Sequence, residues 1–354
     1  MPDDDSPFAV LRWFDLGYRE RPADVLDRAE GGSNAAHHPL AVEIGEWVIE
    51  TTLAQMESWQ AAGFDLAMSV NVGAAQLQQS DFADRLRARL AAHPKVKPVN
   101  LELEVVETSA MQDVVSTSHV LAACREIGVS IGLDDFGTGY SSLTYLKRLP
   151  ANVLKIDQSF VRDMLEEPEN LTILEGVLGL ASAFHRQVIA EGVETPEHGL
   201  MLLQMGCDLA QGFGIAAAMP ARDLPSWAAA WHPAPLWAEV PVVCAENRPV
   251  LYAAVEHRAW LGAFEAYLHG KRVVAPPLNA AQCRIGLWLD GEKQAARGVH
   301  SAIQAIDSLH RQVHEVASEI FASQTNGSNP SGLARLRHLH HVHERCLKRL
   351  KALA

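Results

Sequence analysis

The fold is decided by the stretch Leu133-Asp134-Asp135-Phe136-Gly137-Thr138-Gly139-Tyr140-Ser141-Ser142, which begins where an apolar, strand-like run ends. Ionised aspartate is rarely buried unless it is paired or binds a metal, and two adjacent carboxylates repel each other unless a cation lies between them. The glycine-rich turn that follows supplies N–H groups and hydroxyls, which suit a phosphate. The alternative is a solvated β-turn, and we favour a functional strand end because similar strand ends recur along the chain.

Five further strand-like segments carry polar residues at or near their ends. They are residues 66–72 with Asn71, 100–106 with Glu104 and then Glu107, 153–157 with Lys155 and Asp157, 188–190 followed by Glu191 and Glu194, and 208–210 followed by Gln211. Helical patterns lie between them at 82–92, 115–127, 159–164, 172–184 and 196–205. Strands that alternate with helices predict an α/β fold with a parallel sheet. Polar residues after successive strands predict a TIM-like (β/α) barrel with its site on that face.

The composition excludes several classes of protein. The chain has 354 residues and a net charge of −13, which argues against a protein that coats a nucleic-acid polymer. Its five cysteines are scattered and form no disulfide framework, so we expect a reducing, cytoplasmic location. The acidic start has no apolar signal core, and no apolar run is long enough to predict a membrane span.

Together, these motifs resemble the EAL-domain cyclic di-GMP phosphodiesterases over residues 8–231. The resemblance rests on segments 11–13, 70–72, 104–107, 134–142, 154–157, 190–194 and 211–213. It implies that two Mg²⁺ or Mn²⁺ ions are held, the first by Asn71, Glu104 and Asp134, and the second by Asp134, Asp135 and Glu191. Oxygen ligands suit such ions independently of the resemblance.

The resemblance also implies the reaction and the remaining roles. One phosphodiester of cyclic di-GMP would be opened to give linear pGpG, with Glu191 at the reacting centre. Lys155 would orient or help to deprotonate the attacking water, or act as a fixed cation, and Gln211 would help to position that water. Four more residues take supporting roles: Glu107 and Glu194 would brace the loop after Asp135, and Arg12 and Asp157 would contact the dinucleotide.

One departure from the family pattern weakens the enzymatic interpretation. Where the family has the metal-binding Glu of its Glu-Ala-Leu motif, the chain has Phe8-Ala9-Val10-Leu11-Arg12-Trp13. Phe8 cannot bind a metal, and only seven residues precede it, so we expect a barrel that is incomplete at its N-terminal strand and hydrolysis that is impaired. Two alternatives stay open: a non-catalytic cyclic di-GMP receptor or partner-binding pseudoenzyme, and a metal-dependent hydrolase of another phosphodiester.

A second domain is predicted after a proline-rich linker at 232–249. Helical patterns at 251–268, 280–289, 299–323 and 332–353 predict a bundle over 250–323, completed or flanked by a helix within 331–354. His310 and His314 are four residues apart, hence on one helical face, where they could hold a metal. The competing interpretation makes Cys283 a small core residue and each histidine surface decoration.

This region resembles the CZB zinc-binding domain of bacterial chemoreceptors, through Cys283-x-x-Gly-x-Trp and His310-x-x-x-His314. The resemblance implies a tetrahedral Zn²⁺ site made of His257, Cys283, His310 and His314, with a thiolate suited to sensing zinc or redox state. The last helix carries four more histidines, which we expect on a solvated basic face: His338, His340, His341 and His343. Cyclic di-GMP is the expected small-molecule partner, and a homodimer, upstream signalling domains and protein partners are left open.

Overall fold

The computed structural model describes residues 14–15, 39–111, 113–139, 143–238, 240–244, 248–294, 300–325 and 332–352. Phe8 and Arg12 lie outside these residues. The chain divides into two units. The first consists of residues up to Arg162 together with Ile173–Pro241, and the second of Asp163–Thr172 together with the chain from Val242.

The first unit is built on a sheet of seven parallel strands that are paired in chain order. The strands are β1 (Phe14–Asp15), β2 (Met68–Asn71), β3 (Leu101–Val106), β4 (Ser130–Phe136), β5 (Val153–Ile156), β6 (Gln187–Glu191) and β7 (Ala210–Gln211). Each strand pairs in parallel with the next. The described part of the chain thus forms an incomplete TIM-like barrel, which confirms the predicted fold class.

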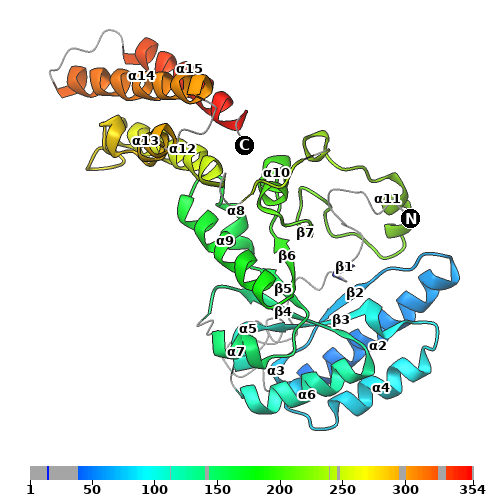
Figure 1. Cartoon of the computed structure of the whole chain (residues 1–354). Helices are drawn as coiled ribbons and strands as arrows, with labels where there is room; N and C mark the ends of the chain where they lie inside the picture. The colour runs from blue at the N-terminus through cyan, green and yellow to red at the C-terminus, as the bar shows by residue number, and fades with distance from the viewer. Residues whose placement is uncertain are drawn as a thin grey trace. The chain divides into compact units, whose positions relative to one another are not determined.

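Helices connect the strands, as parallel pairing requires (Figure 1). Those between the strands are α2 (Pro39–Ala61), α3 (Ala74–Leu77), α4 (Phe82–Ala92), η2 (Pro98–Asn100), α5 (Glu107–Met111), α6 (Val114–Ile127), α7 (Leu143–Arg148), α8 (Gln158–Arg162), α9 (Pro168–Ala183) and α10 (Pro196–Met205). Two more, α11 (Leu224–Ala230) and η3 (Pro235–Trp237), follow the last strand. The helices predicted at 82–92 and 196–205 are found with those bounds. Helix α2 was not predicted. Its buried face includes Ile49 and Leu53, but Leu40 and Trp47 are apolar residues on its exposed side, so its sequence lacks a clear amphipathic pattern.

Both faces of the central strands are buried. All six residues of β3 are buried, although apolar and acidic side chains alternate along it. Leu101, Leu103 and Val105 occupy one face of the strand, and Glu102 and Glu104 the other. Because helices cover only one face of a barrel sheet, these carboxyl groups lie on the inner face, and the barrel interior here is polar.

The second unit is helical, as predicted. Its elements are α12 (Arg248–Leu268), η4 (Ala280–Gln282), α13 (Arg284–Gln294), α14 (His300–Thr325) and α15 (Gly332–Lys351). Helices α14 and α15 pack side by side (Figure 1). The single helix expected at 280–289 is divided in two, because Cys283 adopts an extended conformation between η4 and α13. No helix within the described residues is long and apolar enough to cross a membrane.

One prediction about the last helix is wrong. His338, His340 and His341 are exposed on α15, as expected, but the side chain of His343 is buried. The basic residues around it on the sequence suggested a solvated face, whereas position 343 falls on the same side of the helix as Leu339, Val342 and Leu350, which form the apolar core.

Candidate functional site

The paired aspartates lie at an irregularity of strand β4. Leu133 pairs with Leu154 and Phe136 with Ile156, so β4 uses one more residue than β5 over this interval. Asp135 has a φ of 55°, a left-handed conformation that is uncommon for any residue other than glycine. Bulges of this kind re-aim side chains at functional strand ends, and local strain is concentrated at such sites.

Lys155 lies at the centre of a buried charge cluster. Its Nζ is 2.8 Å from Glu104 Oε1, 2.6 Å from Glu191 Oε1 and 3.7 Å from Asp134 Oδ1. Strands β3, β4, β5 and β6 each contribute one of these four side chains, so the geometry brings together residues spread over 88 positions of the sequence. Burial disfavours the charged amine, but the three carboxylates outweigh it and hold the pKa of Lys155 well above its ordinary value.

Two carboxylate oxygens in the cluster lack a hydrogen-bond donor within the described part of the chain. Glu104 Oε2 and Asp134 Oδ1 are buried and have no hydrogen-bond partner among the described residues. Burial, together with the nearby Asp134, raises the pKa of Glu191 to about 8, although Lys155 pulls it down. Buried acceptors without donors are costly unless a cation or a proton satisfies them. The donor set therefore fits a hard divalent cation.

Three other predicted residues lie at or just after the ends of strands of the same sheet. Asn71 is half-buried at the end of β2, in register with Glu104 on β3. Gln211 Nε2 donates to Glu191 Oε1 over 2.9 Å. Asp157 Oδ1 accepts hydrogen bonds from both the backbone N–H, at 2.9 Å, and the hydroxyl of Ser159.

The two predicted loop-bracing residues differ in their contacts. The N–H of Gly137 donates to Glu107 Oε2 over 3.3 Å. Gly137 has a φ of 103°, a conformation that favours glycine, so the turn and its contact with Glu107 depend on this residue type. Glu194 is exposed after β6, and no hydrogen bond joins it to the part of the Asp135 loop that the structure describes.

One buried acid, Glu102, was not predicted from the sequence. Its carboxylate accepts hydrogen bonds from Ser69 Oγ at 3.2 Å and Ser130 Oγ at 3.4 Å. Burial first, and then the charge of Glu104, raise the pKa of Glu102 to about 8. Its spacing of two residues from Glu104 was an available signal, because alternate residues of a strand share a face.

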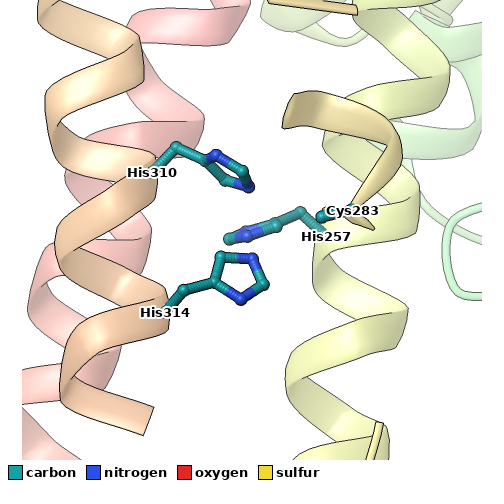
Figure 2. Close-up of side chains that lie close together, drawn as sticks. All are labelled: His257, Cys283, His310 and His314. Carbon is teal, nitrogen blue, oxygen red and sulfur yellow. The ribbon is translucent and has the colours of Figure 1, made fainter. Parts of the chain in front are cut away.

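The second unit contains a cluster of potential metal ligands. His257 from α12, Cys283 before α13, and His310 and His314 from α14 offer donor atoms that all lie within 4.8 Å of one another. Figure 2 shows the four side chains close together, with His310 and His314 on the same helix. The structure thus brings together the four residues that the sequence analysis singled out.

The protonation of these histidines suits metal binding. His314 Nδ1 lies 3.0 Å from the carbonyl oxygen of Leu278, to which it donates, and this leaves Nε2 as the free acceptor. Burial lowers the pKa of His314 to about 4, and burial with the neighbouring histidines lowers that of His257 well below its ordinary value. Neutral imidazoles and one thiol are a donor set typical of Zn²⁺.

Two protein-family models match separate parts of the chain. A model of the EAL domain matches residues 18–218, and a model of the chemoreceptor zinc-binding domain matches residues 257–321. The first match begins after the Phe8–Trp13 stretch, so the alignment of Phe8 with the family's Glu stays a prediction.

Among curated proteins, a cyclic di-GMP phosphodiesterase of Pseudomonas aeruginosa is 37% identical over 221 residues, which are 62% of this chain and 36% of that protein. The bifunctional diguanylate cyclase/cyclic di-GMP phosphodiesterase MucR of the same organism is 39% identical over 186 residues, 52% of this chain and 27% of MucR. The chain therefore spans about a third of the length of these relatives, or less.

Two solved structures are also similar. The MucR phosphodiesterase in complex with c-di-GMP has a TM-score of 0.51 and 37% identity, and the match covers 56% of this chain and 78% of that one. The EAL domain of Mycobacterium smegmatis DcpA has a TM-score of 0.51 and 36% identity, over 53% of this chain and 85% of that one. Because the EAL model matches more than half of the residues of this chain, the chain belongs to the EAL-domain family. A chemoreceptor zinc-binding domain follows the EAL domain in the sequence.

Proposed function

We propose that the first unit binds cyclic di-GMP at the carboxyl ends of its strands and hydrolyses one phosphodiester to linear pGpG, at a rate reduced by Phe8. The observation that carries this proposal is the cluster in which Lys155 contacts Glu104, Asp134 and Glu191. Relatives named as cyclic di-GMP phosphodiesterases support it.

Two groups of residues would hold divalent cations in this proposal. They are Asn71, Glu104 and Asp134 for one ion, and Asp134, Asp135 and Glu191 for the other. Bound Mg²⁺ or Mn²⁺ supplies positive charge for the phosphate and lowers the pKa of a water ligand. The buried acceptor oxygens of Glu104 and Asp134 are the feature of this chain that fits such ions.

The protein's own residues take defined parts around the ions. Lys155 stays protonated and acts as a fixed cation, because three carboxylates raise its pKa. Gln211 orients Glu191 through its hydrogen bond, and Glu107 holds the Gly137 turn. Arg12 and Asp157 contact the dinucleotide.

An alternative is a non-catalytic receptor for cyclic di-GMP, in which the bundle senses zinc or redox state. Phe8 is the observation that favours it, since an aromatic side chain cannot replace a carboxylate ligand. The two functions share the binding site and differ in turnover.

Binding and turnover are tested together on the full chain. Calorimetry with cyclic di-GMP is expected to show binding with Mg²⁺ or Mn²⁺ and none with EDTA. Asp134→Asn should abolish that dependence, whereas Asp208→Asn, an exposed acid just before β7, should preserve it. Equal affinity with and without EDTA would argue against a metal-mediated site.

Turnover is followed by chromatography of pGpG. Phe8→Glu is expected to raise the rate by at least about tenfold, because each ~1.4 kcal/mol of recovered transition-state stabilisation is a factor of ten. Rapid hydrolysis by the unmodified chain would show that Phe8 does not impair it, and no hydrolysis by either chain would favour the receptor.

For the second unit, we propose a structural or sensory Zn²⁺ site formed by His257, Cys283, His310 and His314. The mutual approach of their donor atoms carries this proposal. Four protein ligands complete a tetrahedral zinc site, and the half-buried Cys283 thiol would be held as thiolate by the metal.

A further inference from the structure

The candidate zinc ligand His257 lacks the usual means of orienting an imidazole. A metal-binding histidine commonly donates its second ring N–H to an oxygen, which fixes the tautomer and the angle of the ring. His314 has such a partner in the carbonyl of Leu278. Both ring nitrogens of His257 are buried, and neither has a hydrogen-bond partner among the described residues. Some other contact must therefore set the orientation of this ring.

Two rings lie nearly parallel to His257. The centroid of the Trp260 ring is 5.3 Å away with an interplanar angle of 14°, and that of His343 is 4.9 Å away with an angle of 13°. Trp260 is itself fixed, since its Nε1 donates to the carbonyl of Pro277 over 2.8 Å. Stacking against immobile rings restricts the χ2 rotation of an imidazole in the way that a hydrogen bond otherwise would.

His343 makes a second contact with the same residue. Its Nε2 lies 3.2 Å from the backbone carbonyl oxygen of His257, to which it donates. His343 is only 2% exposed, whereas its neighbour His341 is exposed on the same helix. His343 thus touches both the ring and the backbone of His257 from a helix, α15, that lies beyond the residues matched by the zinc-binding family model.

We propose that His343 is a positioning residue of the zinc centre: it holds the imidazole of His257 in place for the metal. The inference rests on the proposed zinc site. His343 acts through His257, because the four mutually close donor atoms already complete a tetrahedral site and His343 is not one of that group. Zinc affinity consequently depends on the correct docking of α15.

The test uses the full chain and three variants. His343→Leu removes both the ring and the N–H, and His343→Phe keeps a stacking ring but removes the N–H. His341→Leu makes the same change at the exposed position of the same helix and serves as the control. Zinc affinity is measured by competition with a chromogenic chelator, and thermal melting of the metal-free protein is recorded alongside.

We expect His343→Leu to weaken zinc binding by about 10- to 100-fold, the range found for groups that orient metal ligands. His343→Phe should lose less zinc affinity than His343→Leu does, and His341→Leu should bind zinc as tightly as the unmodified chain. With cobalt in place of zinc, the thiolate-to-cobalt absorption and the four-coordinate bands of saturated His343→Leu should be unchanged, because all four ligands remain.

Two results would overturn the inference. One is unchanged zinc affinity in His343→Leu, and if the metal-free protein then melts at a lower temperature, the role of His343 is merely structural. Altered cobalt bands at saturation would show that His343 is itself a ligand. If the unmodified chain binds neither zinc nor cobalt, the zinc site itself fails, and this outcome is distinct from failure of the positioning role alone.

Discussion

Lys155 shows how much a single residue contributes to this barrel. It is fully enclosed and compensates three carboxylates that would otherwise repel one another. Removing one partner of a buried ionic group costs about 3–5 kcal/mol, because uncompensated charge stays behind. We therefore expect Lys155→Met to lower the free energy of unfolding of the first unit by that amount.

A divalent cation should offset part of this loss, since it supplies the missing positive charge. Denaturant unfolding of the full chain with and without Mn²⁺ measures both effects. Lys147→Met, at an exposed position on α7, is the matched control and should change stability little. Similar losses in the two variants, or no benefit from Mn²⁺ in Lys155→Met, would contradict this account of the cluster.

At the scale of elements, His93 ties helix α4 to helix α2. Its Nδ1 lies 2.9 Å from Glu57 Oε2 and its Nε2 lies 3.1 Å from Glu50 Oε1. The hydrogen bond to Glu57, helped by Glu50, raises the pKa of His93 above its ordinary value of 6.5 despite partial burial. The folded protein thus holds this proton more tightly than the unfolded chain does.

This linkage predicts a pH dependence with a defined sign. The stabilisation is fully present below pH 6.5 and is lost as the pH rises through the raised pKa of His93. Because Glu50 is 46% exposed, solvent screening limits the effect to about 1 kcal/mol or less. Unfolding of the full chain between pH 6 and pH 9 measures it. His93→Gln should flatten the curve, and identical slopes for the two proteins would refute the assignment.

Elements with clear periodicity could be predicted from the sequence, and those that depend on pairing could not. The alternation of Leu101, Glu102, Leu103 and Glu104 indicates a strand with one acidic face, which β3 is. The extra residue of β4 is different, because a bulge exists only relative to its partner β5. The charged residues of α15 suggested that its histidines are exposed to solvent. His343 is nevertheless buried, because α15 packs against α12 and α14.

At the scale of the whole molecule, the proposed zinc site would join three segments of the second unit. Metal binding energy should therefore appear as folding stability of that unit. We expect zinc-replete full chain to contain about one Zn²⁺, as a single four-ligand site requires, and a chelator to lower its melting temperature. Elemental analysis measures the zinc content, and calorimetry measures the melting temperature.

Cys283→Ser should weaken zinc binding and lower the same melting transition as the chelator. Cys244→Ser, at an exposed cysteine, is the control and should do neither. Absence of bound metal in zinc-replete protein, or melting that is insensitive to the chelator, would instead favour Cys283 as an ordinary core residue.

The left-handed backbone at Asp135 limits which substitutions can be tolerated there, whatever the chemistry requires. Asparagine, aspartate and glycine adopt this conformation at low cost, whereas β-branched residues do not. In a saturation library at position 135, selection for folded protein alone should retain those three residues and deplete Val, Ile and Thr. Selection for metal-dependent binding of cyclic di-GMP should then retain aspartate. If variants with Val at position 135 fold as well as those with Asn, the backbone does not restrict this position. Comparison of the two selections then distinguishes the residues that the backbone conformation requires from those that binding requires.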